Sequence, residues 1–271
     1  MTILRTLAAA FQGLFPSTRA GQERWRWLLL TLQSILVPVT VSRTSNLLRA
    51  IETLFGVRIA EWRYYTFMAS PKLPWTGLWQ TLWRAIPEPL VAGRLLLALD
   101  DSLNPKTGQH IFACQTTFDH AAKPNQTRWP WAQTLVTLGL LRPIHGRWCC
   151  LPLAFEFYLR RQTLEQGGWR LRGQPVTFAD KFAQAVNMIR RVAACFAGVP
   201  VVVVTDSWFG NNGLFKPLRL AVGARVQLLS RLRVNAALFA QPTPCPGQGL
   251  PSVPFAQHAL NYPGIMFSWA R

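Results

Sequence analysis

The sequence predicts a mixed α/β fold that is preceded by a small all-helical segment. Apolar residues recur at helical spacing over the first 65 residues, whereas apolar and β-branched strand patterns mixed with helical ones fill residues 93–232. A stretch rich in Pro and Trp, residues 70–88, separates the two parts and carries one short helical pattern. Strands that come first and then alternate with helices are typical of a mixed sheet with flanking helices.

The predicted elements of the α/β part can be placed by residue number. We expect strands at 93–100, 110–118, 148–158, 199–205 and 226–232, and helices at 178–196 and 214–221. The run of valines at 201–204 suits the centre of a sheet that is covered on both faces. These patterns predict three regions.

The first region is a helical domain with its linker at 1–90, the second an α/β core at 91–240, and the third a Pro-rich, irregular tail at 241–271. The helical domain alternates a basic face with an apolar face. That pattern fits DNA binding and, equally well, the solvated surface of a packing domain, and it contains no clear helix-turn-helix signature.

The charge balance points to a polyanionic partner. Lys and Arg total 29 and Asp and Glu total 11, which gives a net charge of +18. A folded chain with this imbalance needs a polyanion or bears the cost of self-repulsion. The basic residues are dispersed along the whole chain, and such a surface suits a long nucleic-acid duplex better than one small phosphate ligand. An anionic membrane and an RNA-associated or ribosome-associated role are the alternatives.

Several other classes of protein are disfavoured. The five cysteines form no CxxC pair and have no zinc-ligand spacing with the four histidines, so we expect reduced, mostly buried thiols and a cytoplasmic protein.

The N-terminus lacks the pattern of a signal peptide, and the most apolar stretch, 25–39, falls short of the ~20 residues that span a bilayer. Ser207 has no His and acid partners arranged around it in the sequence, which disfavours a serine hydrolase. Gly210 and Gly213 do not form a phosphate-binding loop. We therefore expect neither a membrane nor a small-molecule substrate as a partner.

Three aspartates stand where apolar strands are predicted to end. Asp100 and Asp101 follow the apolar run 95–99, and Asp206 follows the run 201–205. A carboxylate after a buried strand lies at the edge where open α/β sheets place their sites. Paired carboxylates repel unless a cation lies between them, and hard oxygen ligands select Mg²⁺ or Mn²⁺. Two such ions can activate a water and stabilise a leaving oxygen at a phosphodiester. Each acid taken alone is equally well a helix cap or a turn residue.

Three segments carry a resemblance to a known family. Residues 97–108 (LALDDSLNPKTG) resemble the first-acid region of bacterial insertion-sequence transposases of the DDE type. Residues 201–211 (VVVVTDSWFGN) resemble their second-acid strand, and residues 226–236 (VQLLSRLRVNA) the strand that follows it. The resemblance covers about 95–238. It implies a ribonuclease-H-like fold, Mg²⁺ or Mn²⁺ as cofactor, and cleavage and transfer of DNA strands.

The resemblance also assigns catalytic and metal-binding roles. Asp101 takes the first position because a hydroxyl residue follows it directly, with Asp100 as the fallback, and Asp206 takes the second. The implied partner is double-stranded DNA at transposon ends, in the cytoplasm of a bacterium and associated with the nucleoid, with a homo-oligomer as an option. The candidate DNA-contacting residues are Lys106, His120, Lys123, Arg231 and Arg233.

Alternatives stay open at this surface. His120 is otherwise an ordinary histidine of a surface loop. Trp129 and Trp131 are suited to stacking on a flipped base, although packing tryptophans are commoner.

The third acid of the family pattern is absent from this sequence. That pattern has a Glu on a later helix, and no Asp or Glu follows Asp206 here. We therefore expect a C-terminally truncated or frameshifted copy that transposes little or not at all by itself. Whether its tail after about Gln248 is native to the family stays open. One hypothesis is an impaired transposase. The other is a non-catalytic DNA-binding protein that occupies transposon ends or inhibits the intact enzyme. A basic RNA-associated protein leaves the strand-end acids unexplained.

Overall fold

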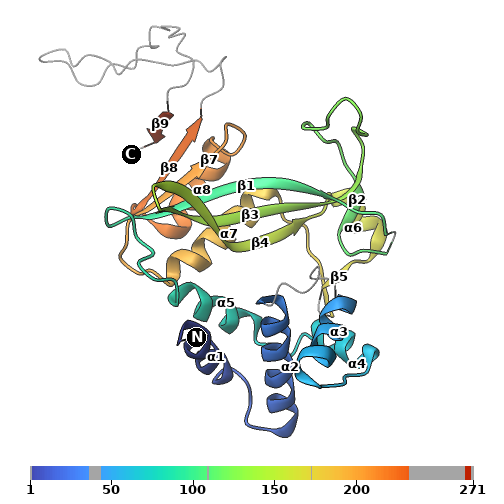
Figure 1. Ribbon diagram of the computed structural model, residues 1–271. Coiled ribbons are helices and arrows are strands. Elements are labelled where there is room, and N and C mark those ends of the chain that lie inside the picture. Colours follow the sequence, from blue (N-terminus) through green and yellow to red (C-terminus); the bar gives the residue numbers. More distant parts are fainter. Residues whose placement is uncertain (1, 37–43, 109, 172, 232–265, 270–271) are drawn as a thin grey trace, which may run out of the picture. The chain divides into compact units, whose positions relative to one another are not determined.

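The computed structural model describes residues 2–36, 44–108, 110–171, 173–231 and 266–269, and the chain divides into two compact units. One unit comprises Met1–Glu88 and Arg160–Phe178, and the other comprises Pro89–Leu159 and Ala179–Arg271 (Figure 1). Residues 160–178, which we expected inside the α/β core, therefore group with the helical unit. They form α6 (Arg161–Gly167) and a small hairpin of β5 (Arg170–Leu171) and β6 (Gln174–Pro175), which is a sheet of its own.

The helical unit is built around one apolar core. Its other helices are α1 (Thr2–Gln12), α2 (Arg19–Leu36), α3 (Thr44–Phe55), α4 (Glu61–Met68) and α5 (Trp75–Arg84). Ile51 and Tyr64 are fully buried in this core. The Tyr64 hydroxyl is satisfied by a 2.7 Å hydrogen bond to Thr31 Oγ1, and burial raises the pKa of Tyr64. The helical pattern of the sequence is confirmed, because its apolar stripes supply this core.

The second unit contains a mixed sheet. Its strands are β1 (Leu95–Pro105), β2 (Cys114–Thr116), β3 (Trp131–Ile144), β4 (Arg147–Tyr158), β7 (Val201–Thr205), β8 (Val226–Arg231) and β9 (Met266–Trp269). The strand order is β2-β3-β1-β7-β8-β9. β4 also pairs with β3, along residues 134–144, which follow the part that pairs with β2. The β1–β7 and β7–β8 pairs are parallel, whereas the other pairs are antiparallel. The predicted mixed sheet with flanking helices is thus confirmed.

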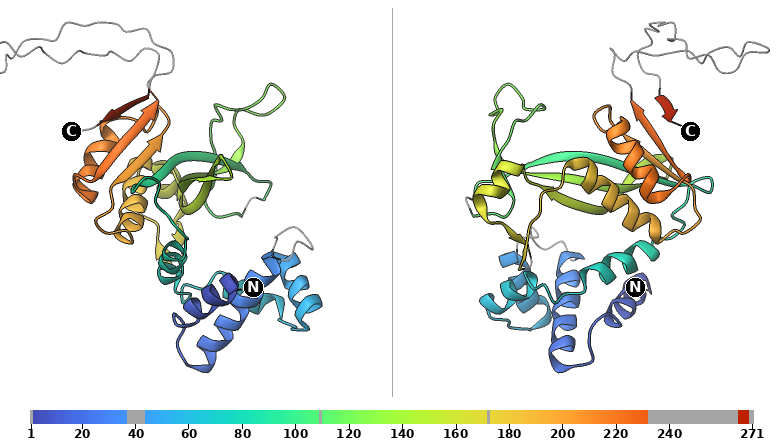
Figure 2. Two further views of the ribbon diagram at one scale, coloured as in Figure 1. Left: turned by 60° about the vertical axis from the view of Figure 1, so that its left-hand side comes forward. Right: turned by 180° about the vertical axis from the view of Figure 1, so that it is seen from behind.

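Two helices cover one face of this sheet (Figure 2). They are α7 (Lys181–Ala194) and α8 (Asn212–Val222). On α7, Met188, Ile189 and Val192 are fully buried, as the apolar period of the sequence predicts. The Asp180 side chain caps the helix by accepting the N–H of Ala183 at 2.7 Å, which satisfies a backbone donor of the first turn.

Arg225 shows that some of the basic residues have structural roles. Its guanidinium donates to the carbonyl oxygens of Phe196 and Val199 at 3.0 and 2.8 Å, and to that of Ala193 at 3.0 Å. These carbonyls follow or end α7, where a cation also complements the helix dipole. Arg225 therefore holds the end of α7 beside β8 and is removed from the set of residues that could contact a nucleic acid.

Three strand predictions need correction. The sequence does not predict β3, because Ala132, Gln133 and Thr134 are all buried, so that the strand lacks a clean alternation. The strand expected at 110–118 shrinks to β2. Residues 266–269 of the tail expected to be irregular form β9, which pairs with β8. An uncovered β8 would expose unpaired backbone groups, and β9 satisfies them. The rest of that tail, residues 241–265 and 270–271, lies outside the described residues.

Two other expectations concern the cysteines and the apolar segments. Cys114 is buried, Cys149 and Cys195 are half-buried and Cys150 is exposed, so the expectation of mostly buried thiols is wrong for the described cysteines. Within the described part of the chain, no helix is long and apolar enough to cross a membrane.

Candidate active site

The candidate site lies where the parallel pairing of β1 with β7 stops. The two strands run side by side from the pair Leu95–Val201 to the pair Leu99–Thr205. β1 continues beyond this point because β3 pairs with it as far as Pro105. Asp100 and Asp101 are therefore residues of β1, and the interpretation that they follow the strand is wrong. They still lie at a sheet edge, because β7 ends beside them and Asp206 is the first residue after it.

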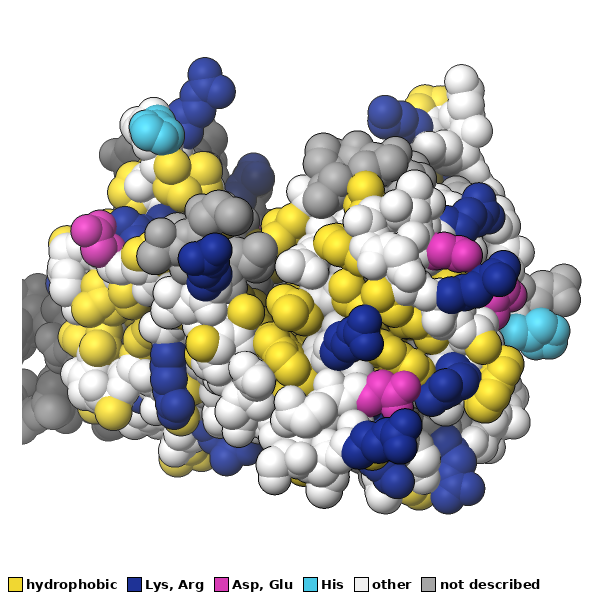
Figure 3. All heavy atoms as spheres, turned by 60° about the horizontal axis from the view of Figure 1, so that its bottom comes forward, with side chains coloured by type: hydrophobic (Ala, Val, Ile, Leu, Met, Phe, Trp, Pro, Cys, Tyr) yellow, Lys and Arg dark blue, Asp and Glu magenta, His cyan; other side chains and the backbone are white. Residues whose placement is uncertain are grey.

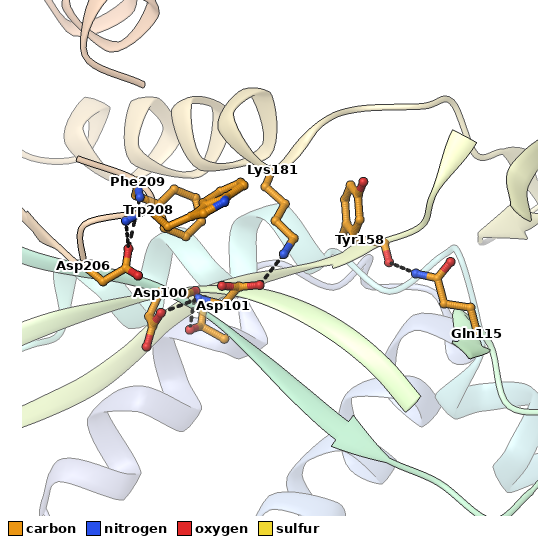
Figure 4. Close-up of polar contacts among 9 residues, drawn as sticks. Asp100, Asp101, Gln115, Tyr158, Lys181, Asp206, Trp208 and Phe209 are labelled. Atoms are coloured by element: carbon orange, nitrogen blue, oxygen red, sulfur yellow. Dashed lines mark hydrogen bonds and ion pairs between the residues drawn. The ribbon is translucent and has the colours of Figure 1, made fainter. Parts of the chain in front are cut away.

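Asp100 and Asp101 point to opposite faces of the sheet, as successive strand residues do. Asp101 is on the face that α7 covers, where its Oδ2 forms an ion pair with Nζ of Lys181, the first residue of that helix. Asp100 points away from Lys181 (Figure 4), and its Oδ1 accepts the backbone N–H of Asp101 at 2.8 Å. Strand geometry thus separates the two neighbours, and Asp101 is the one that faces α7.

Asp206 is held in a tight turn after β7. Its Oδ1 accepts the backbone N–H groups of Trp208 and Phe209 at 3.0 and 3.1 Å. Its carbonyl oxygen accepts the N–H of Gly210 at 3.1 Å and the hydroxyl of Ser230 at 2.9 Å. The short side chain of Asp suits this turn, because it reaches backbone donors two and three residues ahead. Two hydrogen bonds therefore hold the carboxylate, and two on the carbonyl oxygen hold the backbone of Asp206 to the turn and to β8.

The first turn of α7 brings the Asp206 turn and Asp101 to one place. The Trp208 ring stacks on Phe182, the second residue of α7, with 4.9 Å between ring centroids. Nζ of Lys181 lies 5.1 Å from the centroid of the same Trp208 ring while it is paired with Asp101. Figure 4 shows the Asp101 and Asp206 carboxylates on the side of β1 nearer to this helix. Two carboxylates and one ammonium are thus gathered at the end of β7.

The pKa of Asp100 reflects its burial and the charges around it. Burial is the main cause that raises the pKa of Asp100, and the negative charges of Asp101 and Asp206 raise it further. The backbone N–H of Asp101 and the Lys181 ammonium act in the opposite direction. Negative charges that raise the pKa of a neighbouring carboxyl in this way favour a bound cation. Asp100 is therefore within electrostatic reach of the site, although its side chain is on the other face.

Glu156 lies on the α7 face as well, two strands away from Asp101. Asp101 pairs with Val136 of β3, and Val136 pairs with Glu156 of β4, so the three side chains share one face. Glu156 Oε1 accepts from Arg191 of α7 at 2.8 Å. Neighbouring strands are about 4.8 Å apart, and a buried Val136 stands between the acids. Glu156 is therefore a partner of Arg191 and not a third acid of this site.

Glu156 makes stability depend on pH. Burial raises its pKa above the ordinary value of 4.5, although Arg191 and Asn187 oppose the shift. A raised folded-state pKa gives stability that is present below the unfolded-state pKa and is lost as the pH rises through the folded-state value. Glu156→Gln cannot ionise. The unfolding free energy of this variant should therefore gain on that of the natural chain as the pH rises from about 4.5 to 7.

Urea unfolding of both chains at several pH values in this window measures the difference. Glu165→Gln, which alters an exposed side chain of α6, controls for the substitution itself. A difference between Glu156→Gln and the natural chain that stays flat, or shrinks as the pH rises, would contradict the assignment of Glu156.

The site offers a divalent cation two carboxylates. Among the described residues, no group of three or more His, Cys, Asp or Glu side chains could hold a metal ion. Asp101 and Asp206 supply hard oxygen donors, which fit Mg²⁺ or Mn²⁺ and not a thiolate-bound metal. Mg²⁺ is commonly held by one or two carboxylates and keeps several waters. The residues present therefore fit one divalent ion.

The candidate DNA-contacting residues lie in two places. Lys106, His120 and Lys123 belong to the chain between β1 and β3, where His120 and Lys123 are exposed. Arg231 is the exposed last residue of β8, next in register to Asp206, because Thr205 pairs with Ser230. Arg233 lies outside the described residues. Arg231 is therefore the candidate nearest to the carboxylates in the sheet.

An aromatic cluster accompanies the loop before β3. The Phe118 ring contacts His120 at 4.7 Å and Trp129 at 5.1 Å between centroids. Trp129 is 58% exposed and Trp131 is 37% exposed, so neither is a buried packing tryptophan. Trp131 Nε1 donates to the carbonyl of Gly108 at 3.0 Å, which ties this ring to the chain after β1.

The Tyr158 ring also lies at the site, with its centroid 5.3 Å from Nζ of Lys181. Sequence reasoning misses Lys181, Tyr158 and Trp208 as parts of the site. Trp208 is two residues from Asp206, and its proximity was the available signal. Lys181 carries a subtler one, since a cation in the first turn of a helix opposes the helix dipole. Its partner Asp101 is 80 residues away in the chain, which no local pattern reveals.

Comparisons with known proteins support one family. A family model described as DDE superfamily endonuclease matches residues 11–257. No curated protein and no solved structure matches the chain. The matched range runs past Gln248, so the family pattern covers the tail as far as residue 257.

Proposed function

We propose that this chain, which belongs to the DDE superfamily endonucleases and has their ribonuclease-H-like mixed sheet, is the transposase of an insertion sequence. Its substrate is double-stranded DNA at the transposon ends. Its reaction is cleavage and transfer of DNA strands with Mg²⁺ or Mn²⁺. The observation that supports the proposal best is the meeting of Asp101 and Asp206 at the end of β7, beside the first turn of α7.

The residues of the site have separate tasks in this reaction. Asp101 and Asp206 would hold the divalent ion, which would supply the charge that activates water and stabilises the leaving oxygen. In strand cleavage, the oxygen of water forms a bond to phosphorus and the bond from phosphorus to the 3′ oxygen breaks. The proton lost by the water ends on the 3′ oxygen, so the products are a 3′ hydroxyl and a 5′ phosphate. The hydrogen bonds on Asp206 keep its carboxylate in place. Asp101 is aligned by the pairing of its part of β1 with β3.

The surface charge suits a DNA duplex. Lys and Arg side chains are spread over the face drawn in Figure 3 and outnumber the acidic ones there. Contacts of this kind bind phosphates without reading sequence, and they weaken as salt concentration rises. Lys106, His120, Lys123, Arg231 and Arg233 are the proposed contacts, with Arg231 closest to Asp206 in the sheet. The exposed Trp129 offers a ring on which an unpaired base can stack.

A second candidate function is DNA binding without efficient cleavage. It rests on the absence of any Asp or Glu after Asp206 and on the absence of a three-acid cluster among the described residues. Such a chain would occupy transposon ends or join the oligomer of an intact transposase and inhibit it. The two candidate functions share the DNA-binding surface and differ in whether the site cleaves DNA.

Nicking of supercoiled plasmid DNA tests the choice between them. The full chain should convert the plasmid to its open circular form slowly in Mn²⁺ and not in EDTA. Asp206→Ala should abolish this conversion while DNA binding, measured by fluorescence anisotropy, is kept. Binding without any nicking in Mn²⁺ or Mg²⁺ would select the second candidate. Nicking that survives Asp206→Ala would rule out the proposed metal site.

A further inference from the structure

The Lys181 side chain is held in the candidate site from three sides. Its ammonium pairs with Asp101 Oδ2 and lies 5.3 Å from the Tyr158 ring centroid and 5.1 Å from that of Trp208. Aromatic faces attract a cation, and they do so more strongly when it is partly removed from water. The Lys181 side chain is 21% exposed and that of Asp101 is 29% exposed. The ammonium is therefore a fixed positive charge, and it lies at the same oxygen ligands that a divalent cation would use.

The place of Lys181 in α7 works against helix stability. It is the first residue of the helix, where unpaired backbone N–H groups already create a positive potential. The cap of this helix is supplied by Asp180, so Lys181 is not required for it. A cation placed against the helix dipole in this way is expected at a functional position, where another interaction compensates the loss of helix stability. Here the compensation comes from Asp101 and the two aromatic rings.

We propose that Lys181 is a built-in cation of the active site that takes the place of a second divalent ion. The proposal rests on the function proposed above. Asp101 and Asp206 together carry a charge of about −2, which is far from balancing the +4 of two divalent ions. One divalent ion and one ammonium reduce that excess to about +1. An ammonium has three N–H groups, so it can donate to a phosphate oxygen of DNA as well as to Asp101.

Two consequences separate this role from a purely structural ion pair. The ammonium repels a divalent ion at Asp101, so its removal should tighten binding of that ion. The ammonium also stabilises negative charge on the phosphate during cleavage, so its removal should slow cleavage. A structural role predicts neither result in a variant that folds. If Lys181 only competed with the metal, its removal would give tighter metal binding together with faster cleavage.

Mn²⁺ binding to the full chain, followed by the loss of the free-ion signal in electron paramagnetic resonance, tests the first consequence. The natural chain should bind one Mn²⁺. Lys181→Gln, which is neutral and can still donate to Asp101, should bind one Mn²⁺ at least tenfold more tightly. In the plasmid assay with saturating Mn²⁺, the same variant should nick at least tenfold more slowly. Lys181→Arg keeps the charge and should retain weak Mn²⁺ binding and most of the nicking.

Lys216→Met removes an exposed lysine of α8 and serves as the matched control for the loss of one positive charge. The proposal is overturned by two bound Mn²⁺ in the natural chain, by unchanged affinity in Lys181→Gln, or by nicking in that variant at or above the natural rate. Tight binding by Lys181→Arg would overturn it too. Failure of the proposed function looks different, because Mn²⁺ would then bind equally well to Asp101→Asn and Asp206→Asn.

Discussion

Asp101→Asn should lower Mn²⁺-dependent nicking of plasmid DNA by about 100-fold or more, because even outer residues of metal sites cost 10–100-fold and Asp101 is proposed to bind the ion directly. Asn is close to Asp in shape and keeps an oxygen, but it has no negative charge for the cation. The change also leaves the Lys181 ammonium without its carboxylate partner, in a position that is only 21% exposed. Mn²⁺ affinity should fall together with the nicking rate, and both are measured on the same protein.

Asp100→Asn is the matched control for this prediction. The Asp100 side chain is on the other face of β1, and an Asn oxygen can still accept the N–H of Asp101. The loss of nicking should therefore be no more than a few-fold. A loss in Asp100→Asn as large as that in Asp101→Asn would assign the first position to Asp100, or to both residues, and would contradict the argument from strand alternation.

Gly210→Ala should destabilise the protein by about 3 kcal/mol, at the upper end of the range for overpacked sites. A Cβ at this position would overlap Cβ and Oγ of Ser230 in β8, and it would lie 3.2 Å from the carbonyl oxygen of Asp206. The N–H of Gly210 and the hydroxyl of Ser230 both donate to that carbonyl oxygen. The added methyl group therefore pushes apart the contacts that place Asp206. Mn²⁺ affinity should fall as well.

Urea unfolding and Mn²⁺ binding measure the two effects of Gly210→Ala. Gly13→Ala is the control, because the nearest atom to its added Cβ is 3.9 Å away and the change should stay within about 0.5 kcal/mol. Combining Gly210→Ala with Ser230→Gly removes the overlapping atoms and should recover part of the lost stability. A Gly210→Ala variant as stable as the natural chain would show that the Asp206 turn has room to adjust.

Several features of this protein follow from short stretches of sequence alone. The valine run 201–204 predicts β7 because β-branched residues pack well in a covered sheet, and the period of α7 predicts its buried face. The acidic residues beside the apolar runs mark the candidate site, since a charge next to a buried strand must lie at an edge of the core. The excess of Lys and Arg indicates a polyanionic partner.

Only the tertiary structure decides which of these residues meet. β3 is hidden in the sequence because both of its faces are largely buried, and its pairing is what extends β1 beyond Asp100 and Asp101. That extension makes the two aspartates alternate between faces and selects Asp101 as the neighbour of α7. Lys181 meets Asp101 across 80 residues of chain, through the packing of a helix on a sheet. Composition and local period determine elements, whereas register and packing determine which charges share a site, because those depend on residues distant in the sequence.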